Sequence, residues 1–166
     1  KVEALIMLSP FTRDLPADRW FRPLSHLLLA QPWGANLWRI FYQSLHKKHL
    51  PEDMDAYLIQ LTSALKQKGK LKALGEMIRS SKSEIEQSLS KITTPTLVIM
   101  GEVDPDFPNP TEEAHLIQKR MKNTNVKILI LSELGHYPHV ECPQEVNQHL
   151  SQMRSVLCHS VEKAQG

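Results

Sequence analysis

Several signals that define whole classes of protein are missing from this sequence. No stretch approaches the roughly 18 to 20 apolar residues that a transmembrane helix needs, and no charged-then-apolar signal peptide opens the chain. An excess of charge of one sign is missing as well, since 20 Lys and Arg stand against 18 Asp and Glu. The resulting net charge of +2 argues against nucleic acid or a membrane surface as a partner.

Cysteine and cofactor motifs are also scarce. The two cysteines, Cys142 and Cys158, stand on what reads as one helix, which disfavours a disulfide between them and favours a reducing, cytoplasmic location. The sequence contains no glycine-rich phosphate loop and no dinucleotide fingerprint, so we expect no cofactor. His46 and His49 are three residues apart, but no further ligand follows them at a spacing typical of zinc sites.

The chain nevertheless contains enough apolar sequence for a globular core, with 166 residues that are 41% hydrophobic and 23% charged. Three short apolar runs, starting near Val2, Thr96 and Val126, predict buried parallel strands. Three strands make a small sheet, and the apolar edge of the first strand invites pairing with another chain. We therefore expect this sequence to be the C-terminal part of something larger, or to self-associate through that edge.

The stretch from residue 11 to residue 91 carries helix signals and no strand signals. Apolar residues recur there at helical spacing, and Pro23 is expected to break the first run into a turn and a second helix. An insertion of this size above the carboxyl edge of a sheet commonly acts as a lid. Helical packing explains most of its aromatic residues, and Trp33, in a turn, is the best candidate to face a cavity.

Two titratable side chains follow the second and third predicted strands. Asp104 comes just after the run that ends at Gly101, and His136 directly follows Gly135 after the next run. The carboxyl ends of neighbouring parallel strands meet at one edge of a sheet, where ligands of open α/β sheets bind. We therefore expect Asp104 and His136 to lie side by side.

These patterns resemble the α/β-hydrolase superfamily. The segment from Pro95 to Asp104 is similar to the strand and turn that carry the acid in that family. The segment Gly135-His136-x-x-x-x-Glu141-x-Pro143 is similar to the turn that carries its catalytic histidine, and an amphipathic last helix follows. Acid before histidine is also the family's order.

The resemblance implies the fold class and the domains. It implies an α/β protein that is the C-terminal part of an α/β-hydrolase fold, with three parallel strands, flanking helices and a helical cap insertion. Residues 1–10 and 92–160 would form the partial core, residues 11–91 the cap or lid, and residues 161–166 a tail.

The resemblance also implies a chemistry for two residues. His136 would act as general base, and Asp104 would orient it and stabilise its charged form. Asp106 is the alternative acid and Glu102 a more distant one, while His139 is expected at the rim of the pocket or on the surface. The structural alternatives are a turn histidine bonded to a backbone carbonyl and an Asx turn at Asp104.

The nucleophile of such a triad is missing. The six glycines frame no G-x-S-x-G turn, and Ser9, Ser132, Cys142 and Cys158 lack the turn context that a nucleophile needs. The oxyanion-hole donors, which the family takes from the same region, are missing too. We therefore expect the chain as given to lack activity without its N-terminal half, and Glu141 to stabilise the loop before the last helix.

Three functions stay open. The parent enzyme is most simply a carboxylic-ester hydrolase with a Ser-Asp-His triad. An aspartate nucleophile would make it an epoxide hydrolase or dehalogenase, and a truncated, non-catalytic binding module is the third alternative. The presence of both Asp104 and His136 favours an enzyme, and the aromatic cap residues suggest a small apolar or aromatic substrate.

Overall fold

The computed structural model describes residues 2–152. Cys158, the end of the predicted last helix and the predicted tail 161–166 lie outside the described residues. None of the helices among residues 2–152 is long and apolar enough to cross a membrane. The described elements are, in order, β1 (Leu5–Leu8), α1 (Asp18–Leu28), α2 (Gly34–Ser44), α3 (Met54–Lys66), α4 (Lys70–Arg79), α5 (Ser83–Ser88), the 3₁₀ helix η1 (Leu89–Lys91), β2 (Thr96–Gly101), α6 (Pro110–Arg120), β3 (Val126–Leu131) and α7 (Pro138–Glu141).

The chain divides into two compact units. Among the described residues, the sheet unit contains residues 2–10, 46–49 and 87–152, and the helical unit contains residues 11–45 and 50–86. Two short segments differ from the domains expected from the sequence, because 46–49 and 87–91 group with the sheet. The boundary on the C-terminal side falls within α5 rather than after η1.

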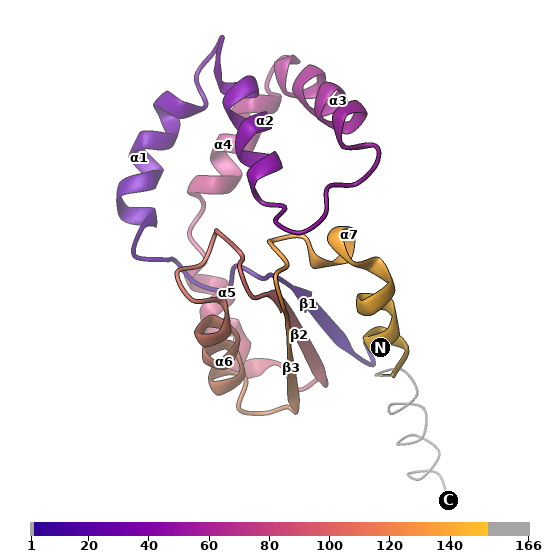
Figure 1. The fold of residues 1–166 in the computed structure, drawn as a ribbon. Coiled ribbons are helices and arrows are strands. Elements are labelled where there is room, and N and C mark those ends of the chain that lie inside the picture. Colours follow the sequence, from indigo (N-terminus) through magenta and orange to yellow (C-terminus); the bar gives the residue numbers. More distant parts are fainter. Residues whose placement is uncertain (1, 153–166) are drawn as a thin grey trace, which may run out of the picture. The chain divides into compact units, whose positions relative to one another are not determined.

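The sheet is parallel, with the strand order β1-β2-β3 (Figure 1). Every residue of β2 is buried, as expected of a central strand whose apolar run is covered on both faces. β1 begins at Leu5, later than the sequence suggested, and lies at one edge of the sheet. The α/β class and the three parallel strands predicted from the sequence are confirmed.

Both faces of the sheet are covered by helices. Leu97 and Ile99 pack with Leu134 and Val146, and Val146 belongs to the helix that follows α7 and is described over residues 143–152. Successive side chains of a strand point to opposite faces, so Val98, which is fully buried, faces the other way. Figure 1 shows α6 on one side of the sheet and the helix of 143–152 on the other.

The start of α6 fixes the length of the loop that follows β2. Asn109 is the N-cap, and its side-chain oxygen accepts a hydrogen bond from the backbone N–H of Glu112 at 3.1 Å. Pro110 occupies the first helical position, where a missing N–H costs nothing. The chain between Gly101 and Asn109 is therefore a short loop at the carboxyl edge of the sheet.

The helical unit has its own small core, in which Ala35, Leu65 and Leu71 are buried. The sequence suggested that Pro23 breaks the first helical run. In the structure Pro23 lies inside α1, which continues past it. The proline removes the hydrogen bond to the carbonyl of Arg19, and Pro23 is exposed, so water can take the place of the lost N–H donor.

Candidate active site

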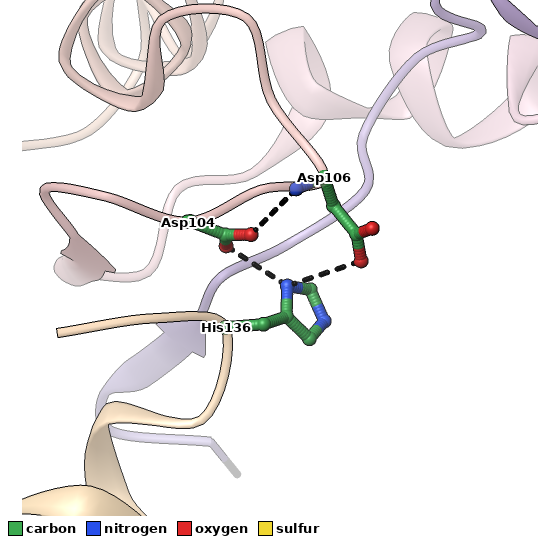
Figure 2. Close-up of side chains that lie close together, drawn as sticks. All are labelled: Asp104, Asp106 and His136. Atoms are coloured by element: carbon green, nitrogen blue, oxygen red, sulfur yellow. Dashed lines mark hydrogen bonds and ion pairs between the residues drawn. The ribbon is translucent and has the colours of Figure 1, made fainter. Parts of the chain in front are cut away.

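The structure brings Asp104 and His136 together at the carboxyl edge of the sheet (Figure 2). Nδ1 of His136 lies 2.8 Å from Oδ2 of Asp104, whose side chain is fully buried, and 12% of the His136 side chain is exposed. The other ring nitrogen, Nε2, points away from the carboxylate (Figure 2). A general base needs this arrangement, in which an acid holds one nitrogen and the other is directed elsewhere.

Asp104 also makes the turn that holds it in place. Its Oδ1 accepts a hydrogen bond from the backbone N–H of Asp106 at 3.0 Å, which is an Asx turn. The turn-forming role and the contact with His136 are therefore not exclusive, because each uses a different oxygen of one carboxylate.

A second carboxylate faces the same histidine nitrogen. Oδ2 of Asp106 lies 3.5 Å from Nδ1 of His136 (Figure 2). Burial raises the pKa of Asp106 to about 6, and the negative charge of Asp104 adds to this effect while the positive charge of His136 opposes it. Asp106 is thus mostly ionised at pH 7 and becomes protonated as the pH falls through about 6.

The surroundings of His136 favour its charged form. Burial alone would lower the pKa of His136, but the hydrogen bond to Asp104 and the charges of Asp104 and Asp106 outweigh it, so the pKa is raised. The ring lies between two aromatic residues, with Phe107 stacked at 6.4 Å and Tyr137 edge-on at 4.9 Å between centroids. These walls limit how far the ring can turn.

Gly101 allows the acid loop and the histidine turn to approach each other. A Cβ added at Gly101 would lie 2.1 Å from the carbonyl oxygen of Gly135 and 2.2 Å from that of Leu134. Backbone hydrogen bonds hold the two segments at this spacing, including one of 3.1 Å from Val103 N to Leu134 O. A glycine at the end of β2 is therefore required for His136 to reach Asp104.

The other titratable candidates, Glu102 and His139, are exposed. The carboxylate of Glu102 accepts hydrogen bonds from the Ser132 hydroxyl at 2.6 Å and from the backbone N–H of Glu133 at 3.3 Å, and all three residues are exposed. His139 is also exposed, and partial burial together with the charges of His136 and His46 lowers its pKa.

Ser9 has a feature that the sequence did not reveal. It directly follows β1 with a φ of 41°, a left-handed conformation that is unusual for serine, and only 3% of it is exposed. Its hydroxyl is buried and has no hydrogen-bond partner among the described residues. A substrate cannot reach a buried hydroxyl, so Ser9 does not supply the missing nucleophile in this structure.

The cluster at His136 is also the place where described residues could hold a cation. Asp104, Asp106 and His136 each offer a ligand atom, and these atoms lie within 4.8 Å of one another. A metal ion there would have to displace the hydrogen bond between Asp104 and Nδ1 of His136. The short contact between these two atoms is better explained by an acid that orients a base.

An apolar cavity of about 360 Å³ lies within the helical unit. It is lined by aromatic and aliphatic side chains from α1, α2 and α4 and by Leu29, which follows α1, and Ser44 supplies a polar side chain. Trp33 is not in this lining but is half exposed, and its indole N–H donates to the Leu27 carbonyl at 2.9 Å. The aromatic and large aliphatic lining residues include Phe21, Leu37, Trp38, Ile40 and Phe41.

Comparison with known proteins identifies the fold. No protein-family model matches the sequence, and no curated protein matches it. Among solved structures, MenH from S. aureus is similar with a TM-score of 0.65 and 19% identity, over 94% of this chain and 60% of that chain. A thermophilic esterase from Thermogutta terrifontis has a TM-score of 0.62 and 18% identity, over 93% of this chain and 56% of the esterase. CarC, a serine hydrolase involved in carbazole degradation, has a TM-score of 0.64 and 17% identity, over 93% of this chain and 55% of CarC.

The chain therefore has the fold of an α/β-hydrolase, and only part of it. It spans between 55% and 60% of the length of these three proteins while nearly all of it is matched. The predicted resemblance is confirmed at the level of the fold.

Proposed function

We propose that this chain supplies the acid and the base of an α/β-hydrolase that cleaves carboxylic esters, together with a serine nucleophile from sequence outside this chain. The observation that carries the proposal is the contact of 2.8 Å between Nδ1 of His136 and Oδ2 of the fully buried Asp104. Hydrolases, including an esterase and a serine hydrolase, are among the proteins of similar fold.

The proposed chemistry uses the two nitrogens of His136 differently. Nε2 takes the proton of the serine hydroxyl as its oxygen bonds to the ester carbonyl carbon, and returns that proton to the departing alkoxide. In the second half, Nε2 takes a proton from water as the water oxygen bonds to the acyl carbon, and returns it to the serine oxygen as the acyl–serine bond breaks. Asp104 accepts a hydrogen bond from Nδ1 throughout and stabilises the imidazolium.

The proposed substrate carries an apolar or aromatic group. The cavity of the helical unit supports this, because its lining is almost entirely hydrocarbon and contains no charged side chain. Uncharged, mainly hydrophobic lining is typical of sites for apolar ligands. A series of p-nitrophenyl esters with acyl chains of increasing length tests this preference, because kcat/KM should rise with the apolar surface of the acyl group. The cytoplasmic location expected from the sequence stays a prediction.

Ester turnover with matched variants tests the proposal. We would measure hydrolysis of p-nitrophenyl acetate by the 166-residue chain and by the product of its complete reading frame, each with His136→Ala and Asp104→Asn. In the active protein each variant should lower kcat about 10⁴-fold. His139→Ala is the control, and should retain turnover because His139 is exposed and does not contact Asp104. Full activity of His136→Ala would refute the proposal.

A serine-reactive fluorophosphonate probe identifies the nucleophile. Labelling of the active protein supports the serine mechanism, whereas turnover without labelling indicates the aspartate mechanism. Turnover by the 166-residue chain alone, lost in both variants, would contradict the proposed external nucleophile.

A further inference from the structure

Glu141 is a buried carboxylate that the proposed reaction does not use. It is 5% exposed, and both of its oxygens accept hydrogen bonds from backbone N–H groups. Oε1 accepts from Gly135 at 2.8 Å, while Oε2 accepts from Lys47 at 2.8 Å and from Lys48 at 2.7 Å. Hydrogen bonds to an ionised acceptor are roughly twice as strong as neutral ones, so three of them on one buried group make a firm attachment.

The segment held by Glu141 comes from a distant part of the chain. Residues 46–49 lie in the connection between α2 and α3, more than 90 residues before Glu141 in sequence, yet they group with the sheet unit. Two further contacts fix this segment. The Lys48 ammonium lies 2.8 Å from the Glu133 carboxylate, and the rings of His46 and Tyr137 are 5.2 Å apart.

All of these contacts fall on residues that surround His136. Glu133 and Gly135 precede it, and Tyr137 and Glu141 follow it. Gly135 and Tyr137 are its direct neighbours in sequence, and the contacts involve the backbone N–H of Gly135 on one side and the ring of Tyr137 on the other. Both neighbours of His136 are therefore in contact with Glu141 or with residues 46–49.

We propose that Glu141 is a positioning residue that fastens the α2–α3 connection to the histidine turn, so that His136 keeps its contact with Asp104 only while residues 46–49 are docked. The consequence for turnover rests on the proposed function; the structural coupling does not. When the Glu141 carboxylate is removed, the backbone N–H groups of Gly135, Lys47 and Lys48 lose their acceptor. The histidine turn is then no longer attached to residues 46–49 through Glu141.

NMR spectroscopy of the 166-residue chain tests this coupling without any turnover. The variant is Glu141→Gln, and the matched control is Glu112→Gln, the same change at an exposed glutamate of α6 in the same unit. We expect Glu141→Gln to accelerate amide exchange at Lys47 and Lys48 more than tenfold and to lower the pKa of His136, while amides of β2 keep their protection. The control should change neither readout.

Two outcomes would overturn the proposal. Unchanged exchange at Lys47 and Lys48 would show that Glu141 does not hold the segment. A pKa of His136 that stays unchanged while the amides of Lys47 and Lys48 exchange faster would show that Glu141 only stabilises the fold. The same conclusion would follow if the amides of β2 exchanged as fast as those two.

A second variant covers the case in which Glu141→Gln does not fold. Lys48→Pro removes one donor while Glu141 and its hydrogen bond from Gly135 remain, and the pKa of His136 should again fall. A wild-type pKa in this variant would refute the coupling. If the pKa of His136 falls in these variants but the protein does not hydrolyse esters, the positioning role stands and the proposed reaction is wrong. If the protein hydrolyses esters but the pKa of His136 does not fall, the reaction stands and the positioning role is wrong.

Discussion

The two units of this chain treat apolar residues in opposite ways. In the sheet unit all six residues of β2 are buried, and Ile99 and Val98 have no exposed surface. In the helical unit the large apolar side chains of α1 and α2 are widely exposed, with Trp20 at 77% and Ile40 at 65%. A pattern of apolar residues thus indicates both an element and its burial in β2, whereas in α1 and α2 it indicates the element while many of its large apolar side chains stay exposed.

This difference shows which unit can hold side chains in fixed positions. A candidate site that depends on contacts below 3 Å needs neighbours that cannot move, and close packing around β2 provides them. The helical unit, with a small core and exposed apolar surface, is suited to contact with a ligand or another surface. The following predictions test whether the contrast holds.

The largest effect is expected at a glycine of the sheet unit. Gly101→Ala should lower the free energy of unfolding by more than about 3 kcal/mol, because its Cβ would overlap two backbone carbonyl oxygens that cannot move independently. Gly75→Ala in α4 is the comparison. Its Cβ would meet only the flexible Arg79 guanidinium, and alanine favours a helix, so the change should stay within about 1 kcal/mol. Urea unfolding of both variants measures the difference, and equal losses would break the contrast.

A matched pair of isoleucines gives the next effect. Ile99→Ala should cost about 2 to 4 kcal/mol, because Ile99 is fully buried and the change leaves a cavity. Ile40→Ala should cost about 0.5 kcal/mol or less, because Ile40 is mostly exposed. The measurement is residue-resolved hydrogen exchange, which reports each unit separately. A large loss at Ile40 would mean that its exposed side is covered in solution.

The same contrast explains what could be predicted from the sequence. The strands, the acid loop and the histidine turn were predictable, because β-branched runs ending in Gly101 and before Gly135 leave few alternatives. The attachment of residues 46–49 was not, since backbone N–H groups bind Glu141 and carry no side-chain signature. Pro23 was misleading because contacts of the following turn, such as the hydrogen bond of 3.2 Å from Arg79 to the Ser25 hydroxyl, hold α1 together despite the cost of an internal proline.

Aspartates of the two units should respond to pH with opposite signs. The pKa of Asp106 is raised from 3.8 to about 6, so its contribution to stability is present at low pH and is lost as pH rises through about 6. Asp106→Asn should therefore stabilise the chain at pH 8, by at most about 3 kcal/mol, and should flatten the loss of stability between pH 4 and 7.

Asp14 in the helical unit is the matched comparison. The backbone N–H of Lys82 lowers the pKa of Asp14 more than burial raises it, and Ser81 and Arg22 add to the lowering. Its contribution is present above pH 4 and is lost as pH falls through the lowered pKa, so Asp14→Asn should destabilise near neutral pH. Thermal unfolding from pH 3 to 8 measures both variants, and a common sign would contradict the two environments.

The last pair of variants tests which unit carries the surface for self-association, and is expected to change stability least. Ile6 lies on the edge strand β1, and Trp20 lies on the exposed face of α1. Either residue replaced by lysine should change the unfolding free energy by less than about 0.5 kcal/mol, because both are at least partly exposed. A charge on an edge strand opposes strand pairing, so sedimentation velocity should show that Ile6→Lys shifts the chain towards monomer while Trp20→Lys does not. The reverse result would assign association to the helical unit, and its exposed apolar residues would then be the stronger interaction surface.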